Sequence, residues 1–305
     1  MILGRCPSCA APARRPWLRH PELSLWLCER CGLGYTDPQP REEVERRYLS
    51  QYDLADHFGA LEQRKAVLNA QRLDRLPART GGTLLDVGCG DGQFAAAARD
   101  RGWVAQGVEL NPPAAQAARE RGVNVVEGRL EEVEPLRAAF DVVTAWDVIE
   151  HVPEPRRFAE ELVRRVAPGG LLVVTTLNRR ALVARMFRGR WSMVAVDHFT
   201  YWDERSLSHA FADTGMRKIS IRSFGLGRDF VSWIDRLRGR REHLASVVPR
   251  TSRAPAAPAD GWDTTPLVLT AERALNQVLD VTSLGVGVEI VLSRASELTS
   301  RAEGV

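Results

Sequence analysis

The chain has 305 residues, which is long enough to bury one large core or two smaller units. Its hydrophobic content of 44% and charged content of 27% are globular values and exclude a disordered or fibrous chain. The net charge of +3 is nearly balanced, so it does not by itself favour binding to nucleic acid or to a membrane.

Two C-x-x-C pairs, separated by 18 residues, lie near the start of the chain. Their cysteines are Cys6, Cys9, Cys28 and Cys31. This spacing predicts a tetrahedral zinc site with four thiolate ligands, in a zinc ribbon over residues 1–40. Such a site holds together a segment that is too small to build its own core. Disulfides are the alternative, but the cytoplasm disfavours them.

The cytoplasmic assignment rests on two features of the sequence. No run of 18 apolar residues is present, so we expect no membrane-spanning helix. The first residues, MILGRCPSCA, lack the pattern of a secretory signal peptide.

The role of the ribbon stays open at this point. Two tryptophans and four basic residues lie between its cysteine pairs: Trp17, Trp26, Arg14, Arg15, Arg19 and His20. They could stack on and neutralise a planar or phosphorylated ligand, or could simply pack. The ribbon is therefore interpreted either as a structural cap or as a recognition element. Residues 41–76 follow as a helical linker, with helices predicted over Arg41–Tyr52 and Leu61–Leu76.

The most informative segment is Thr83–Phe94, TLLDVGCGDGQF. An apolar run ends in Asp86, a turn with three alternating glycines follows, and a helix-forming stretch begins at Gln93. This pattern is typical of a buried parallel strand that leads into a helix. The glycines let the backbone approach a ligand closely. The next strand, Val104–Leu110, carries Glu109, which is placed to accept hydrogen bonds from both ribose hydroxyls of a nucleoside. The G-x-G-x-G spacing argues against a dinucleotide.

The rest of the chain alternates strands and helices. Strands are predicted over Val123–Glu127, Phe140–Ala145, Leu171–Thr176, Arg217–Phe224 and Gly287–Leu292, and helices over Pro155–Val166, Ser206–Thr214 and Leu267–Val281. An insertion at residues 225–265 is expected to be partly flexible. Within it, residues 230–244 predict a basic amphipathic helix that packs on the core or contacts a membrane surface.

Together, DVGCGDG, Glu109, FDVVTAWDVIEHVPEP and APGGLLVVTTLN resemble successive motifs of the class I S-adenosylmethionine-dependent methyltransferases. The resemblance is continuous over about Leu76–Ser223. It implies an α/β, Rossmann-like fold with a seven-stranded sheet of order 3-2-1-4-5-7-6, in a domain over residues 77–305. N-terminal helices often lie over the active site in this family, which makes Tyr48, Tyr52 and His57 lid candidates.

The resemblance also implies which residues hold S-adenosylmethionine. Asp86 and the backbone of Gly88 and Gly90 would hold its amino-acid part. The helix N-terminus after Gly92 would favour its carboxylate. Glu109 would bind the ribose.

The remaining cofactor contacts come from three further strand ends. Leu110 would lie against the adenine, and Arg129 and Leu130 follow the third strand, where the family places adenine contacts. Trp146 and Asp147 would close the floor of the site under the sulfonium.

An oxygen nucleophile must lose its proton during methyl transfer, so a base is expected near the fourth strand. Asp147, Glu150 and His151 follow that strand, and His151 is the first candidate base, although it could instead only fix the loop. His198, in the loop after the fifth strand, is the second candidate, as base or substrate ligand. The pattern of Asp147, Glu150 and His151 also resembles the divalent-ion site of the ubiquinone-biosynthesis O-methyltransferases, so Mg²⁺ is an alternative there.

We therefore expect an S-adenosylmethionine-dependent methyltransferase that acts on a small molecule, such as a sugar, a lipid or a natural product, with oxygen as the acceptor atom. One alternative is a zinc-ribbon rRNA methyltransferase, which the near-neutral charge disfavours. A second is a non-catalytic scaffold with the same fold, which the intact cofactor motifs oppose. The sequence identifies neither the acceptor nor an oligomeric state.

Overall fold

The computed structural model describes residues 4–37, 43, 46, 49, 62–77, 81–133, 139–225 and 282–296. Several predicted features lie outside these residues: the lid candidates Tyr48, Tyr52 and His57, the insertion after residue 225 with its basic segment 230–244, and the helix predicted over Leu267–Val281. Of the helix predicted over Arg41–Tyr52, only residues 43, 46 and 49 are described. Of the helices that the structure describes, none combines the length and the apolar character needed to cross a membrane.

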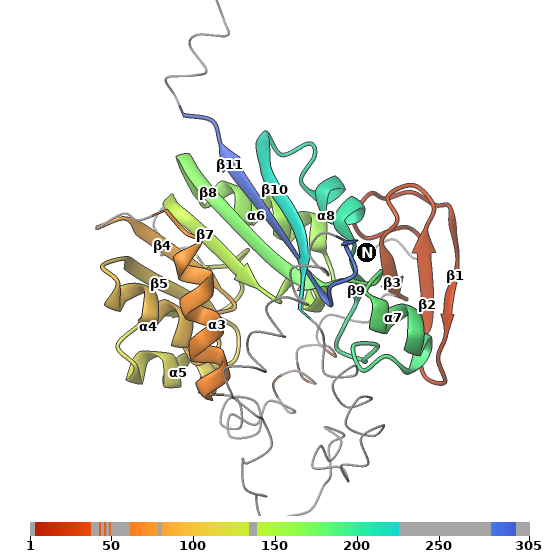
Figure 1. Cartoon of the computed structure of the whole chain (residues 1–305), viewed down its shortest axis with the longest axis horizontal. Helices are drawn as coiled ribbons and strands as arrows, with labels where there is room; N and C mark the ends of the chain where they lie inside the picture. The colour runs from red at the N-terminus through yellow and green to blue at the C-terminus, as the bar shows by residue number, and fades with distance from the viewer. Residues whose placement is uncertain are drawn as a thin grey trace, which may run out of the picture.

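A seven-stranded sheet forms the centre of the molecule (Figure 1). Its strands are β4 (Thr83–Val87), β5 (Val104–Glu109), β6 (Asn124–Glu127), β7 (Phe140–Trp146), β8 (Val166–Leu177), β10 (Met216–Phe224) and β11 (Gly287–Arg294). They lie in the order β6-β5-β4-β7-β8-β11-β10. The first five are parallel, and β11 is antiparallel to both β8 and β10. Numbered along the chain, this order is 3-2-1-4-5-7-6, which confirms the predicted fold.

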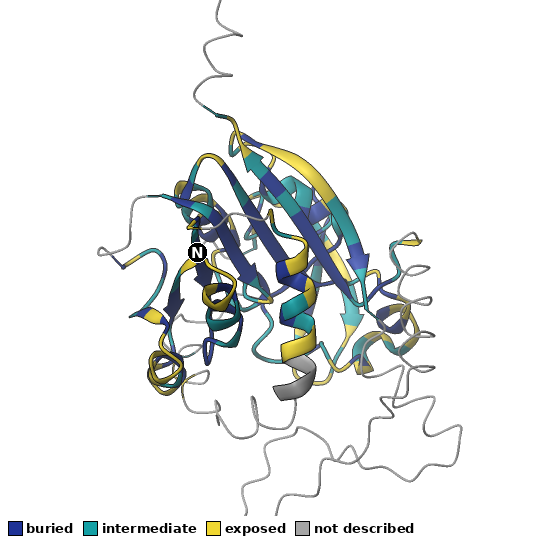
Figure 2. Ribbon diagram, turned by 60° about the vertical axis from the view of Figure 1, so that its left-hand side comes forward, coloured by how far each residue is buried: buried dark blue, intermediate teal, exposed yellow. Residues whose placement is uncertain are grey.

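Helices cover both faces of this sheet (Figure 1). On one face lie α3 (Glu62–Asp74), α4 (Gln93–Asp100) and α5 (Pro112–Glu120), and on the other lie α6 (Pro155–Arg164) and α8 (Glu204–Ala210). Successive strand side chains point to opposite faces, so Leu84 packs with Phe94 of α4 whereas Leu85 packs in the cluster that contains Leu162 of α6. Both leucines are fully buried, and Figure 2 shows the buried strands between the helices.

Local signals fix two helix starts beside the carboxyl ends of the strands. Asn111 caps α5 by accepting a 3.0 Å hydrogen bond from the Ala114 N–H, and Pro112 follows as the first helical residue. Asp203 and Ser206 form a reciprocal capping box at the start of α8. A polar cap of this kind contributes about 1 kcal/mol. The first cap places α5 directly after Glu109, which is a predicted ligand residue.

The ribbon is a second, four-stranded sheet of order β1-β2-β3-β9. It contains β1 (Arg14–Arg19), β2 (Ser24–Cys28), β3 (Gly34–Thr36) and β9 (Thr200–Tyr201). The fourth strand belongs to the segment after β8, which also contains a short helix, α7 (Leu182–Phe187), and the 3₁₀ turn η3 (Arg188–Arg190). The boundary of the ribbon predicted at residue 40 therefore leaves out one strand of its sheet.

Candidate functional site

The glycine turn after β4 requires glycine for two separate reasons. Gly88, Gly90 and Gly92 all have positive φ, of 70°, 56° and 77°. A Cβ on Gly88 would lie 2.6 Å from a methyl carbon of Val148, and one on Gly92 would lie 2.7 Å from the Cβ of Ala118. Any side chain at these two positions would therefore both strain the backbone and clash. The turn brings backbone N–H groups to the edge of the sheet at the N-terminus of α4.

Glu109 ties the end of β5 to this turn. Its Oε2 accepts a 2.8 Å hydrogen bond from the Gly90 N–H, and its Oε1 accepts a 2.8 Å hydrogen bond from the Asn111 N–H. The side chain is nearly fully buried. The glycine turn and Glu109, which the sequence predicts to share one site, are therefore in direct contact.

Asp86 lies at the end of β4, on the same edge of the sheet. Thr144 on β7 donates a 2.8 Å hydrogen bond from Oγ1 to the Asp86 Oδ1. Burial raises the pKa of Asp86 to about 7, although the Thr144 hydrogen bond and the charge of Arg72 act in the opposite direction. Near neutral pH this carboxyl is therefore divided between its charged and neutral forms.

Arg72 on α3 belongs to the site and was missed by the sequence analysis. Its guanidinium lies 4.3 Å from the ring centre of Trp146, and its Nη2 lies 3.3 Å from the Asp147 Oδ2. The Trp146 ring also contacts Phe94 edge-on, at 5.1 Å between ring centres. The Trp146 Nε1 is buried, and no described residue forms a hydrogen bond with it. An arginine on a helix upstream of the glycine turn has no local sequence signature, so only the fold could place it.

The other predicted cofactor residues lie along the same edge. The Gly128 N–H donates a 2.8 Å hydrogen bond to the Glu109 carbonyl, which joins the ends of β5 and β6. Leu130 is buried, whereas Leu110 and Arg129 are partly exposed. All three residues follow strands that end beside the glycine turn.

The structure brings together the two predicted bases, His151 and His198, whose ring centres are 4.6 Å apart. We call these two residues the histidine pair. The His151 Nδ1–H donates a 2.9 Å hydrogen bond to the Asp197 carbonyl, and the His198 Nδ1–H donates a 2.6 Å hydrogen bond to the Met193 carbonyl. Because a carbonyl can only accept, Nδ1 of each ring carries a proton, and the neutral form of such a ring has its lone pair on Nε2. Burial, together with the neighbouring His198, lowers the pKa of His151 to about 4.

The predicted magnesium ligands are not gathered in this way. Asp147 has φ of 57°, and its carboxylate accepts from the Thr175 Oγ1 and faces Arg72. Glu150 points into the core, where the Thr176 Oγ1 donates to its Oε2 at 2.9 Å and burial raises its pKa to about 8. Among the described residues, the metal-ligand types that cluster near His151 are instead Asp197 and His198, with one ligand atom from each of the three within 4.8 Å of the others.

The four ribbon cysteines form the second cluster of this type. Their sulfur atoms all lie within 4.8 Å of one another, with Cys6 and Cys31 at 3.6 Å and Cys9 and Cys28 at 3.5 Å. None is in a disulfide. Tetrahedral zinc with a Zn–S distance of about 2.3 Å requires sulfurs about 3.8 Å apart, so the observed arrangement suits such an ion.

Backbone hydrogen bonds connect the ribbon to the histidine pair. The Thr36 N–H donates to the Phe199 carbonyl at 3.0 Å, and the Phe199 N–H donates to the Glu150 carbonyl at 2.8 Å. The ring of Trp17 lies 5.1 Å from the ring of Tyr201 on β9. A continuous path therefore runs from the ribbon, through the segment that carries His198, to the turn that carries His151.

Comparisons with known proteins identify the family of the chain. A family model described as a methyltransferase domain matches residues 60–221. The chain is 37% identical, over 122 residues, to the ubiquinone biosynthesis O-methyltransferase of Xanthomonas oryzae pv. oryzae (strain PXO99A), in a match that covers 37% of this chain and 51% of that protein. It is 28% identical over 222 residues to the enzyme of the same name from Photorhabdus laumondii, covering 69% of this chain and 84% of that one.

A crystal structure of an S-adenosylmethionine-dependent methyltransferase from Thermotoga maritima superposes with a TM-score of 0.50 at 20% identity, over 83% of this chain and 98% of that one. That likeness shows the fold alone. The chain spans about half the length of the Xanthomonas enzyme. The family match itself covers more than half of the chain, and the chain therefore belongs to the methyltransferase domain family.

Proposed function

We propose that the protein is an S-adenosylmethionine-dependent O-methyltransferase that acts on a small molecule, with His151 as the general base. The observation that carries this proposal is the alignment of two sites along one sheet edge. The glycine turn with Asp86 and Glu109 suits the cofactor, and the histidine pair follows the neighbouring strands β7 and β8. This arrangement supports a role for His151 as a base acting beside the cofactor.

The residues of the first site fit the cofactor. The glycine turn has positive φ at Gly88, Gly90 and Gly92, and Glu109 presents a buried carboxylate of the type that binds ribose hydroxyls. The guanidinium of Arg72, which faces the Asp147 carboxylate in this structure, suits the methionine carboxylate, and Asp86 suits the ammonium group. Leu110, Arg129 and Leu130 would flank the adenine. These assignments are proposals.

The chemistry that the protein must supply is limited. The cofactor provides a methyl group on a sulfonium, and the transfer is an in-line displacement. His151 is neutral near pH 7 because its pKa is lowered to about 4, so its Nε2 can accept the proton of the acceptor hydroxyl. The Asp197 carbonyl fixes the tautomer of His151, and His198 lies against its ring.

We also propose that the ribbon cysteines Cys6, Cys9, Cys28 and Cys31 bind one structural zinc ion. The described ribbon has buried leucines, but part of its sheet is supplied by β9, so its fold depends on support from both the metal and the domain. The close approach of four unpaired thiols supports this assignment.

The proposal is tested first by cofactor binding. S-adenosylhomocysteine is titrated calorimetrically into the wild type, Glu109→Gln and the control Glu127→Gln, which alters an acid at the end of the neighbouring strand β6. We expect Glu109→Gln to weaken binding about 30-fold, which corresponds to about 2 kcal/mol for charge-assisted hydrogen bonds to the ribose, and the control to bind normally. Equal binding by both variants would contradict the site, and no binding by the wild type would favour the scaffold alternative.

The acceptor class is tested second. Purified protein is incubated with S-adenosylmethionine and panels of hydroxyl-bearing sugars, lipids and phenols, and S-adenosylhomocysteine release is measured. Activity on a hydroxyl compound that His151→Asn abolishes would support O-methylation. Activity confined to ribosomal RNA would contradict the small-molecule assignment.

A further inference from the structure

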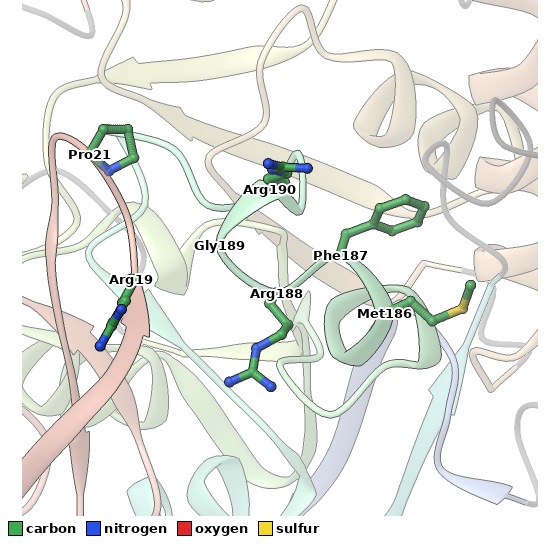
Figure 3. A pocket seen from close by; sticks show the side chains of 7 residues that line it. All are labelled: Arg19, Pro21, Met186, Phe187, Arg188, Gly189 and Arg190. Carbon is green, nitrogen blue, oxygen red and sulfur yellow. The ribbon is translucent and has the colours of Figure 1, made fainter.

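A pocket of about 440 Å³ lies between the ribbon and the segment that follows β8 (Figure 3). It is lined by Arg19 and Pro21 from the β1–β2 hairpin, and by residues 186–190, which include the end of α7 and all of η3. Three of the seven lining residues are arginines, and none of the seven is acidic. The pocket therefore presents positive charge from two elements that are far apart in sequence.

The charge environment of these three arginines can be compared with that of Arg14 and Arg72. Arg14 and Arg72 each pair with a carboxylate, at 3.1 Å and 3.3 Å. Within the described part of the chain, by contrast, no carboxylate lies within ion-pair distance of Arg19, Arg188 or Arg190. Their charges are left for solvent or for a bound anion.

The walls of the pocket are closely packed. An added Cβ on Gly189 would lie only 2.0 Å from the Arg19 carbonyl oxygen, so the two backbones touch at this point. Arg188 has φ of 51°, in the left-handed region that favours glycine, and its carbonyl accepts a 3.1 Å hydrogen bond from the N–H of the fully buried Trp191. The surrounding structure therefore holds the Arg188 backbone in a fixed and strained conformation.

The two ends of the pocket differ in chemistry. In Figure 3 the guanidinium groups of Arg19 and Arg188 lie toward one end, and Phe187 and Met186 extend on the other side. The guanidinium of Arg190 lies apart from those of Arg19 and Arg188. Met186 is 44% exposed, and Leu182, one helical turn earlier on α7, is 37% exposed. A guanidinium group matches the oxygen atoms of a phosphate in charge and geometry.

We propose that this arginine pocket binds the phosphate or diphosphate group of an amphiphilic small molecule whose apolar chain lies along Met186 and Phe187. The same segment continues to Met193, whose carbonyl accepts from His198. The pocket therefore lies on the loop that carries half of the histidine pair. The idea that this ligand is the methyl acceptor rests on the proposed function. The binding of a phosphate-bearing amphiphile in the pocket does not depend on it.

The test is a set of titrations on the full chain with S-adenosylhomocysteine present. The probes are monomeric dodecyl phosphate, inorganic phosphate and the neutral dodecyl maltoside. We expect dodecyl phosphate to bind at least tenfold more tightly than either of the others. Equal binding of the maltoside would overturn the role of the arginines, and equal binding of inorganic phosphate would overturn the role of the apolar end. Binding only to phosphatidylglycerol vesicles would also overturn the proposal, since it would indicate a membrane surface.

Variants complete the test. Arg188→Gly removes the charge and suits the positive φ, so we expect a melting temperature no lower than that of the wild type together with at least tenfold weaker binding of dodecyl phosphate. Arg19→Gln should weaken binding similarly, whereas Arg217→Gln, which removes an exposed arginine from β10, should not. Unchanged binding in both pocket variants would refute the site. Affinity for S-adenosylhomocysteine is measured on the same samples, so failure of the cofactor site and failure of the pocket are distinguished.

Discussion

Replacing Asp86 by Asn tests how the cofactor edge of the sheet is built. The Asp86 side chain is buried, and it accepts its hydrogen bond from Thr144 at 2.8 Å. Burial raises the pKa of the carboxyl to about 7. Asn has nearly the same shape and still offers an oxygen to Thr144. The substitution therefore removes the charge and leaves the packing largely unchanged.

The expected effect on stability follows from the two pKa values. The carboxyl titrates at about 7 in the folded chain, against an ordinary value of 3.8. The folded state therefore holds the proton more tightly, so the stabilising contribution of Asp86 is fully present below about pH 4 and is lost as the pH rises to about 7. At 1.36 kcal/mol for each pH unit, the free energy of unfolding falls by about 4 kcal/mol over this range. The Asp86→Asn variant should not show this decrease.

The assay is urea unfolding of the wild type and Asp86→Asn at several values between pH 4 and pH 8. The difference in free energy of unfolding between the two proteins isolates Asp86, because all other groups titrate in both. Thr144→Val removes a hydrogen bond that favours the charged form, so it should move the inflection of the wild-type curve to higher pH. Parallel curves for the wild type and Asp86→Asn would refute the reasoning.

Three further predictions concern other parts of the site. Arg72→Met should weaken S-adenosylhomocysteine binding about tenfold in calorimetry, because one charge-assisted hydrogen bond is lost, and unchanged affinity would contradict its role. His151→Asn should lower kcat by about 10²–10⁴-fold without changing that affinity, and protonation of His151 should lower wild-type kcat/KM as the pH falls toward about 4. Cys31→Ser should eliminate the zinc measured by mass spectrometry and lower the melting temperature, whereas retention of one zinc per chain would count against the four-cysteine site.

The central fold was predictable because its signals are local. The apolar run before Asp86, the alternating glycines and the acid at position 109 each report on a few neighbouring residues, and the structure places them in contact. Strand order came from the family resemblance and is also confirmed. The observed ends of most strands and helices differ from the predicted ends by a few residues. The largest difference is at the start of β8, which begins at Val166 rather than Leu171.

The features that could not be predicted from the sequence depend on contacts between residues far apart in the chain. His151 and His198 are 47 residues apart, and only the packing of the segment after β8 brings their rings to 4.6 Å. The short strand β9 has two residues and exists only because β3 pairs with it. Proximity in sequence was also misleading, since Asp147 and His151 lie four residues apart while the backbone at Asp147 turns its carboxylate toward Thr175.

The position of β9 bears on what the ribbon does. A two-residue strand cannot persist alone, so the segment around Thr200 and Tyr201 depends on its pairing with Gly34 and Tyr35. His198 lies two residues before that strand, whereas Glu109 and the glycine turn share no strand pairing with the ribbon. Loss of the ribbon should therefore disturb the acceptor side and spare the cofactor side. If the pocket binds the acceptor as proposed, the ribbon is both a structural cap and a recognition element, because its strand β3 pairs with β9 next to His198 and its β1–β2 hairpin supplies Arg19 to the pocket.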